Sequence, residues 1–504
     1  MEGLIIVANR SPINFEKEGE KPRLGIGGLV QAMSGLLKDG KTSWVGLAGG
    51  EYDFQKCDSE HKIEYKDDAY HFHMKKVFLS QRAIKRYYFN FCNSYLWPLF
   101  HLTYPKILRS KGFPVPEYSS RDFGFYEMAN TTFANAVIEE YLHEKRPIWV
   151  QDYHFLLLPE KVKGMLKRRL GEKVALGQFI HIPFFSPDVL RKTKRLKGKK
   201  RELREVWKEI LPGMLANDLL GFHVPEYVEN FVSAVEHYLP KARIKAEKDL
   251  YRVDFHNKRC WIGSFPIGID LERFEKRVLE EDISYKKPDF DLKKVIERRK
   301  KKGIKIYAGV DRLDYTKGIL ERLEILETLL DLGERLQYIG FSPRSRTEAK
   351  GYRELQKKAS EKVKEINRRF KPKLGYEPVI YRVEHIPFPE NYKLLRDADV
   401  VLVTSLEDGM NLVAFEAIYS KKYRPEEGRG KLVLGRCGAS KLLEDYGRED
   451  GIIRIDPFRK KESAKRISKP SGNISDRLID FVEREVDVNK WCKKFLETLY
   501  EVGK

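Results

Sequence analysis

The sequence has little cysteine and lacks the arrangements in which cysteine usually acts. Its 504 residues include five cysteines, and none of them lies in a C-x-x-C pair. Scattered cysteines, odd in number, argue against a disulfide framework and a zinc ribbon, and they favour a reducing cytoplasm.

Long hydrophobic runs are also missing. The apolar run at residues 4–8 is too short for a signal peptide, and no basic leader precedes it. No stretch approaches the roughly 18 uninterrupted apolar residues of a membrane span. The sequence therefore predicts a cytoplasmic protein that does not associate with membranes.

Charge is plentiful and unbalanced. Lys and Arg (96) outnumber Asp and Glu (75), which gives a net charge of +21. Such a protein binds nucleic acid in one interpretation. Acids and bases interleave nearly everywhere, however, as on a thermophile-type surface with ion-pair networks, and phosphorylated substrates would also favour a positive field. The long basic run at 191–201 contains no aromatic residue, so we expect no nucleic-acid partner.

Short apolar runs alternate with longer amphipathic stretches along the whole chain. This pattern is typical of βαβ units and a parallel sheet, and the length suits two domains of about 200–250 residues. The predicted strands are residues 4–8, 43–48, 148–151, 175–180 and 219–222 in the first half and 304–309, 336–341, 379–383, 400–404 and 432–435 in the second.

A polar stretch at residues 241–259, which we predict to be poor in strands, separates the two halves. The predicted domains are residues 1–245 and 246–478, followed by a C-terminal helix at 479–504 that returns to the first domain. Ligands of doubly wound sheets bind at the carboxyl ends of the strands, so we expect both domains to face one cleft.

Two cations follow the predicted strand 304–309, namely Arg312 and Lys317. A guanidinium can grip a diphosphate as a fork, and an ammonium adds a point charge. When a nucleotide-sugar reacts, negative charge grows on the leaving diphosphate, and positioned cations stabilise it. Taken alone, the segment is also compatible with a solvated basic turn before a helix.

A second polar segment follows the predicted strand 400–404. Gly409 permits a tight turn, and the amides of residues 410–413 would open a helix, which is a natural anion site. Asp408 suits a sugar hydroxyl, and Glu416 suits the two hydroxyls of a ribose. The alternative is a capped helix with an ordinary acid at each end.

Three further segments lie in the first half. His181 follows the predicted strand 175–180, and Asp152 follows the strand 148–151. Either residue could simply be a satisfied polar group at a strand end. Residues 86–101 are dense in aromatics, and Tyr88 and Trp97 belong either to the core or to a wall on which a sugar stacks.

Taken together, these segments resemble the trehalose-6-phosphate synthases, retaining glycosyltransferases of the GT-B fold. The resemblance covers nearly the whole chain, and its longest motifs are residues 312–318 and 408–413. It implies an α/β protein with two Rossmann-like, doubly wound domains facing a cleft. It also implies transfer of glucose from a nucleotide-glucose donor to glucose 6-phosphate, giving trehalose 6-phosphate.

The resemblance further implies a role for each matching residue. The implied donor-binding residues are Gly27, Gly28, Arg312, Lys317, Ile386, Asp408, Gly409, Met410, Asn411, Leu412, Val413 and Glu416. The implied acceptor-binding residues are Arg10, Tyr88, Trp97, Asp152 and Arg346. The implied catalytic residues are His181, Arg312, Lys317 and Asp408. Front-face attack, in which the leaving phosphate helps to take the acceptor proton, requires no metal or other cofactor, and we interpret the D-x-D pattern at 289–291 as helix capping.

Three departures from the family pattern lie in the acceptor half. Leu47 stands where a second tryptophan is expected, Gln151 replaces a histidine, and the basic run at 191–201 is long. They leave open a different phosphorylated acceptor, such as glycerol phosphate or inositol phosphate. A sugar-phosphate sensor on an inactive scaffold is a further alternative, and the donor nucleotide and any homo-oligomer are also left open.

Overall fold

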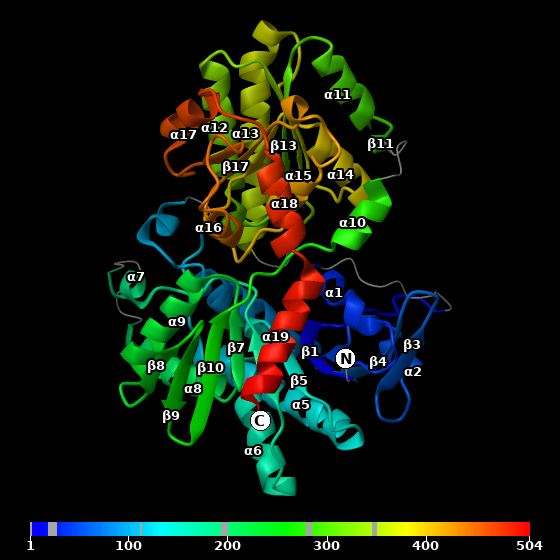
Figure 1. Cartoon of the computed structure of the whole chain (residues 1–504), viewed down its shortest axis with the longest axis vertical. Coiled ribbons are helices and arrows are strands. Elements are labelled where there is room, and N and C mark those ends of the chain that lie inside the picture. The colour runs from blue at the N-terminus through cyan, green and yellow to red at the C-terminus, as the bar shows by residue number, and fades with distance from the viewer. Residues whose placement is uncertain are drawn as a thin grey trace. The chain divides into compact units, whose positions relative to one another are not determined.

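The structure is a computed structural model, and it describes residues 3–18, 28–110, 113–192, 200–278, 285–344 and 350–503. The chain forms two compact units (Figure 1). Unit 1 comprises Met1–Pro105, Val115–Pro266 and Val488–Lys504, and unit 2 comprises Lys106–Pro114 and Ile267–Asp487. The boundary thus lies after Pro266 instead of residue 245.

Unit 1 is built on one sheet of ten strands in the order β3-β4-β2-β1-β5-β6-β7-β10-β9-β8. The strands from β4 to β10 are parallel, and the two edges are antiparallel. In that spatial order, the strand bounds are β3 Lys62–Lys66, β4 His71–Val77, β2 Ser43–Leu47, β1 Ile5–Arg10, β5 Ile148–Gln151, β6 Leu176–Phe179, β7 Leu219–Phe222, β10 Lys258–Ser264, β9 Leu250–Phe255 and β8 Arg243–Glu247.

Helices of unit 1 connect and cover these strands. Continuous apolar strands are buried by helices on both faces, and the core joins β1 and β5 to α5 and α6. The helices are α1 Gly28–Ala32, η1 Ser34–Leu37, α2 Asp53–Lys56, α3 Gln81–Ile84, η2 Lys85–Leu96, α4 Trp97–Phe100, α5 Ser120–His143, η4 Tyr153–Phe155, α6 Leu158–Leu170, α7 Pro187–Lys192, α8 Lys200–Met214, α9 Pro225–Tyr238 and α19 Val488–Val502.

The prediction that residues 241–259 are poor in strands is wrong. This stretch holds β8, β9 and the start of β10, which extend the sheet as an antiparallel meander. Its turns are two residues long, and Lys248 (φ 54°) and His256 (φ 53°) adopt the left-handed region without glycine. A charged edge meander with no Gly-containing turn lacks the usual hairpin signal.

The predicted C-terminal segment consists of two helices that belong to different units. α18 (Asp476–Glu485) is part of unit 2, and α19 is part of unit 1. In unit 1, Phe495 stacks on Trp149 with ring centroids 4.8 Å apart. Gly221 of β7 makes room for this helix, since a Cβ there would lie 2.7 Å from both Phe179 and Phe495.

Unit 2 is built on a parallel six-stranded sheet in the order β15-β14-β13-β16-β17-β18. Its strands are β15 Val379–Arg382, β14 Leu336–Phe341, β13 Lys305–Val310, β16 Val400–Val403, β17 Lys431–Leu434 and β18 Ile452–Arg454, and a separate hairpin pairs β11 Lys286–Lys287 with β12 Phe290–Asp291. Its helices are η3 Pro105–Arg109, α10 Leu271–Val278, α11 Leu292–Lys300, η5 Tyr315–Lys317, α12 Ile319–Asp331, α13 Lys350–Leu374, α14 Phe388–Asp397, α15 Val413–Tyr419, η6 Glu426–Gly428, α16 Gly438–Leu442, α17 Lys460–Ser468 and α18.

Both sheets share one doubly wound topology. Numbered by chain order, the parallel strands run 3-2-1-4-5-6 in unit 2, and the same order, extended by one strand, runs through unit 1. The strand order reverses between β1 and β5 in unit 1 and between β13 and β16 in unit 2. Ligands of doubly wound sheets bind where the order reverses, at the carboxyl ends of the strands. The predicted fold class is confirmed.

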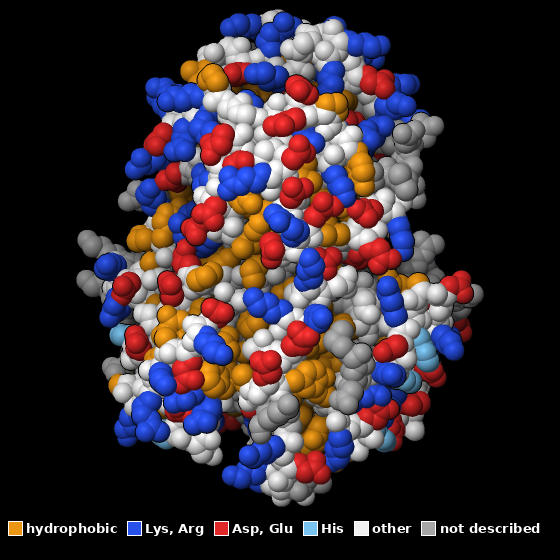
Figure 2. Space-filling model, in the orientation of Figure 1, with side chains coloured by type: hydrophobic (Ala, Val, Ile, Leu, Met, Phe, Trp, Pro, Cys, Tyr) orange, Lys and Arg blue, Asp and Glu red, His pale blue; other side chains and the backbone are white. Residues whose placement is uncertain are grey.

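The distribution of surface charge, the helix composition and the state of the cysteines can each be compared with the sequence analysis. Figure 2 shows Lys and Arg interleaved with Asp and Glu on the face it presents, without a continuous basic stripe. In the described part of the chain, no helix has the length and apolar character needed to cross a membrane. Cys57 is half-buried, the other four cysteines are buried, and all five are free thiols.

Candidate active site

In unit 2, the two motifs with the strongest chemical signal follow the strands that flank the switch point. Arg312 and Lys317 lie after β13, and Asp408 lies after β16. β13 and β16 are direct neighbours in the sheet. The motifs are therefore brought together at one sheet edge.

Lys317 and Asp408 form an ion pair between these two loops. Lys317 is buried, with 8% of its surface exposed. The loops also approach through their backbones, because Leu406 N–H donates to Thr316 C=O at 2.7 Å. Gly318 has φ 62°, and a Cβ there would lie 2.2 Å from the carbonyl oxygen of Thr404, so glycine is required.

A buried network behind this pair holds the same loops. Arg322 of α12 is 1% exposed and pairs with Asp311. Its Nε donates to Thr404 Oγ1 at 2.9 Å. Asn411 Nδ2 donates to Asp311 Oδ1 at 3.3 Å and to Ser405 Oγ at 3.0 Å. The sequence analysis missed this network, although an arginine one helical turn inside an otherwise apolar helix face is a signal for it.

Asn411 also has a special backbone. Its φ is 65°, in the left-handed region, which asparagine tolerates better than most residues. The side chain and the backbone of Asn411 thus together define the turn that precedes α15.

Glu407 is a second group that the sequence analysis missed. Its side chain is fully buried, and it is neutralised by Arg436 and Lys441, each at 3.1 Å. These pairs tie the loop after β16 to residues that follow β17.

Backbone groups of the predicted donor loop, residues 409–413, are hydrogen-bonded to residues outside it. Gly409 N–H donates to Asp408 Oδ1 at 2.9 Å, so this amide is already satisfied. Met410 C=O accepts from Ala439 N–H at 2.9 Å. Leu412 is the N-cap of α15, and Val413 is its first residue.

Glu416 lies in the first turn of α15 and is half-buried. Burial raises the pKa of its carboxyl to about 7, and the Asn391 amide, 3.5 Å from Oε2, and the charge of Arg273 only partly oppose this effect. Ile386, the predicted neighbour of the nucleobase, is buried in the loop between β15 and α14.

Unit 1 also places predicted residues at its switch point. Arg10 ends β1, and Asp152 directly follows β5. Arg10 is exposed, and its Nη2 donates to Tyr88 Oη at 3.5 Å. Tyr88 in turn stacks on His154, with ring centroids 5.7 Å apart. Arg10, Tyr88 and His154 therefore form one connected group.

His181 and Asp152 are joined as well. His181 N–H donates to Asp152 Oδ1 at 3.2 Å. Asp152 has φ 69°, a conformation that costs a non-glycine residue about 1–3 kcal/mol and is typical of functional sites. Burial, with smaller contributions from His223 and His154, lowers the pKa of His181 well below its ordinary value, so its ring is neutral.

Gln151, noted in the sequence as a departure from the family pattern, contacts this imidazole. His181 Nε2 lies 2.9 Å from Gln151 Oε1. With the Gln151 carboxamide in this orientation, its oxygen accepts from His181 Nε2–H, and Nδ1 is then an acceptor. Gln151 is fully buried, so its position is fixed by the core.

The other predicted positions differ in how far the structure describes them. Trp97 is 4% exposed and packs on His101 and Tyr153, which are also buried, so its ring belongs to the core and not to an exposed wall. Gly28 is the first residue of α1. Gly27 and Arg346 lie outside the described residues, as does most of the basic run.

The D-x-D pattern is engaged in other contacts. Asp291 is the N-cap of α11 and accepts from Lys294 N–H at 3.0 Å, as predicted. Asp289 pairs with Arg382 at 2.9 Å. Neither carboxylate needs a metal ion to be satisfied.

Comparison with known proteins decides the family. The model described as glycosyltransferase family 20 matches residues 2–501. The chain belongs to glycosyltransferase family 20. The predicted family and enzyme class are confirmed.

The chain is also similar to named enzymes over most of their length. The UDP-forming α,α-trehalose-phosphate synthase 56 kDa subunit of Kluyveromyces lactis is 31% identical over 521 residues, covering 99% of this chain and 96% of that protein. The corresponding enzyme of Schizosaccharomyces pombe is 32% identical over 478 residues, covering 92% and 82%. A crystal structure of the UDP-forming enzyme of Burkholderia xenovorans has a TM-score of 0.76 at 27% identity and covers 100% of each chain.

Proposed function

We propose that this family 20 enzyme transfers glucose from UDP-glucose to glucose 6-phosphate, releasing UDP and forming trehalose 6-phosphate with retention at the anomeric carbon. The relatives named above are UDP-forming α,α-trehalose-phosphate synthases. The observation that carries the proposal is the meeting of Arg312, the Lys317–Asp408 pair and the α15 loop at the switch point of unit 2.

The donor would bind at this edge of unit 2. Arg312 and Lys317 would hold the diphosphate, and Asp408 would accept a hydroxyl of the transferred glucose. Glu416, whose pKa burial raises to about 7, would accept hydrogen bonds from the two ribose hydroxyls. Because Lys317 and Asp408 are held by their ion pair before the donor arrives, they need little rearrangement as charge develops on the leaving diphosphate.

The acceptor would bind at the switch point of unit 1. The exposed guanidinium of Arg10, beside the Tyr88 hydroxyl, suits the phosphate of glucose 6-phosphate. Asp152 suits a sugar hydroxyl. The neutral His181 would accept a hydrogen bond from a sugar hydroxyl at Nδ1, because its Nε2 already contacts Gln151.

The departure from the family pattern at Leu47 means that the identity of the acceptor needs an experimental test. Leu47 ends β2, is half-buried and pairs in register with Arg10, so this departure from the family pattern lies beside the proposed phosphate site. Another phosphorylated acceptor is therefore the second candidate.

An acceptor panel separates the two candidates. Purified protein is given UDP-glucose with glucose 6-phosphate, glycerol phosphate or inositol phosphate, and release of UDP is followed together with the product. A non-reducing disaccharide phosphate formed only from glucose 6-phosphate supports the first proposal. UDP release with another phosphate alone would overturn it and keep the donor site. An Arg312→Ala variant controls for contaminating activity.

A further inference from the structure

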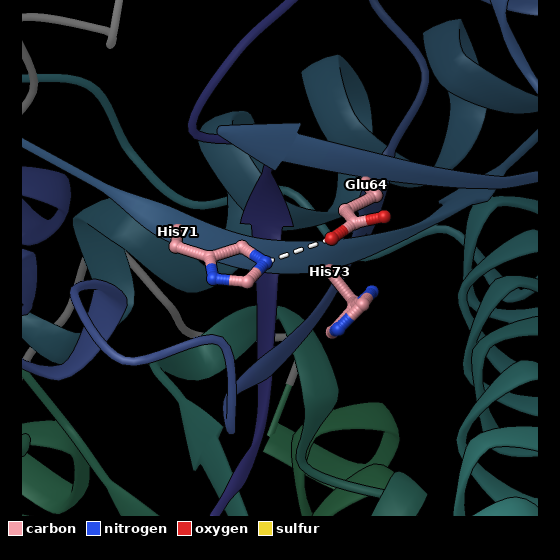
Figure 3. Close-up of side chains that lie close together, drawn as sticks. All are labelled: Glu64, His71 and His73. Atoms are coloured by element: carbon pink, nitrogen blue, oxygen red, sulfur yellow. Dashed lines mark hydrogen bonds and ion pairs between the residues drawn. The ribbon is translucent and has the colours of Figure 1, made fainter. Parts of the chain in front are cut away.

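Glu64, His71 and His73 form a cluster at one edge of unit 1 (Figure 3). Each residue offers one ligand atom, and these atoms all lie within 4.8 Å of one another. In the described part of the chain, it is the only group of three or more such side chains that meets this distance. The pairing of β4 with β2 places the cluster at the sheet edge opposite the strand ends that carry the proposed reaction.

The geometry of the β3–β4 hairpin brings the three side chains together. His71 and His73 are two residues apart on β4, so they share a face of the sheet. Glu64 on β3 lies directly opposite His73 in the antiparallel register, which brings their side chains into cross-strand contact range. Figure 3 shows the His71 imidazole directed at the Glu64 carboxylate, with the His73 ring beside them.

The position of the cluster separates it from the proposed active site. His73 pairs with Ser43, the first residue of β2, so the cluster lies at the amino-terminal edge of the parallel strands. Arg10 ends β1 at the opposite, carboxyl-terminal edge. Substitutions in the cluster therefore leave the proposed reaction residues intact.

The orientation of His71 is set by its surroundings. Gly40 packs against the imidazole, since a Cβ there would lie 2.7 Å from two ring atoms. Gly40 N–H also donates to His71 C=O at 2.8 Å. With the ring held in this way, His71 Nε2 lies 2.8 Å from Glu64 Oε1.

We propose that Glu64, His71 and His73 bind a divalent transition-metal ion, with Zn²⁺ as the best match. Two imidazole nitrogens and one carboxylate oxygen are a ligand set that zinc uses with water as the fourth ligand. Zinc–ligand distances of about 2.0–2.2 Å place tetrahedral ligand atoms roughly 3.3 Å apart. The ligand atoms, which lie within 4.8 Å of one another, can adopt this arrangement if their side chains rotate, since all three side chains are at least partly exposed.

Neighbouring charges decide whether a cation is tolerated. Lys62 and Lys75 share this face of the hairpin, but both are paired, Lys62 with Glu60 at 2.8 Å and Lys75 with Glu139 at 2.7 Å. The remaining cation on the face is Lys66, which is exposed at the end of β3 and can extend into solvent.

The bound ion would link β3 to β4. β3 is the edge strand of the sheet, and an edge strand is held on one side only, so it frays more readily than the central strands. A metal bridge across the hairpin adds ligand bonds to that single ladder. The ion therefore has a structural role here and no part in glycosyl transfer.

Isothermal titration of tag-free, chelator-treated full-length protein with ZnCl₂ tests the proposal. We expect one site in the wild type, at least tenfold weaker binding in His73→Ala and no site in the double variant His71→Ala with His73→Ala. His237→Ala, which removes an exposed histidine of α9, is the matched control and should bind as the wild type does.

Hydrogen exchange gives a second, independent measurement. Zn²⁺ should slow amide exchange in β3 at least threefold in the wild type and leave the double variant unchanged, with equal transferase rates in both proteins. Binding of equal strength in the wild type and the double variant, or no binding at 1 mM Zn²⁺, would overturn the proposal. Since transferase activity is measured separately, that outcome would leave the proposed function untouched.

Discussion

Glu416→Gln should change stability and donor affinity in opposite directions, which makes it the sharpest test of the proposed donor site. Burial raises the pKa of this carboxyl from 4.5 to about 7. Between these two values the native state binds more protons than the unfolded state, so stability falls as the pH rises through this window. The full loss above pH 7 is about 3 kcal/mol, since one pKa unit is worth about 1.4 kcal/mol.

The neutral amide of Glu416→Gln removes this cost. We expect the stability gap between variant and wild type to grow by about 2 kcal/mol from pH 5 to pH 8, with the variant more stable at pH 8. Urea-induced unfolding at both pH values measures the gap. Glu427→Gln, at an exposed position of η6, is the control and should show no such growth.

Donor binding should respond in the opposite sense. Ribose hydroxyls donate to the ionised carboxylate, whose fraction falls from about 0.9 at pH 8 to about 0.1 at pH 6 when the pKa is 7. The wild type should therefore bind UDP-glucose about tenfold more weakly at pH 6 than at pH 8. Glu416→Gln should bind more weakly than the wild type at pH 8, by about tenfold or more, and show little change between the two values.

Calorimetric titration with UDP-glucose at both pH values measures this binding, and two of its results would refute the reasoning. If Glu416→Gln bound UDP-glucose as tightly as the wild type at pH 8, the carboxylate would have no part in donor binding. If the wild type and the variant had parallel pH profiles, another group would be responsible for the pH dependence. A stability gap that stays constant from pH 5 to pH 8 would show that the pKa of Glu416 is not raised.

Four further predictions test other parts of the structure. Arg312→Ala should lower kcat by about 10²–10³-fold, the usual effect of removing one preorganised charge donor, and near-normal turnover would exclude the residue from the donor site. Gln151→Glu should raise the pKa of His181, because a carboxylate stabilises the imidazolium, and a pH profile of kcat/KM identical to that of the wild type would contradict the 2.9 Å contact. Gly221→Ala should destabilise the protein by about 1–3 kcal/mol because its Cβ meets Phe495, whereas Gly124→Ala, where nothing lies within 4 Å, should be neutral or stabilising in thermal unfolding. A chelator should leave the transferase rate largely unchanged. If the chelator abolished activity, Asp289 and Asp291 would again be candidate metal ligands.

The central strands could be predicted from the sequence because each is a continuous apolar run. The predicted strands 148–151 and 219–222 coincide with β5 and β7. The strands at and beside the two edges of the unit 1 sheet were missed, namely β3, β4 and the β8–β10 meander, because the outermost strands β3 and β8 carry charged residues on a face that is only partly covered. Their pairing is set by contacts across the sheet, which a local pattern does not report.

The positions of Arg312, Asp408 and His181 could also be predicted, because each follows a recognisable parallel strand and such strands end at one sheet edge. Their partners could not. The contacts of His181 with Gln151 and of Arg322 with Thr404 join residues 30 and 82 positions apart. The aromatic run at 86–101 was ambiguous for another reason. Residues Lys85–Leu96 form a π-helix, whose i→i+5 bonding shifts side chains away from the α-helical period.

The charged groups at the switch point of unit 2 divide into two kinds. Arg322, Asp311 and Glu407 are buried, and each is neutralised by a partner within the protein. Buried ion pairs often add little to stability, because desolvation offsets their attraction. Their value here is positional, since they fix the loops from which other groups reach solvent. Arg312 is exposed on one of those loops, so a charge-balanced support presents a cation that is accessible to the diphosphate of the proposed donor.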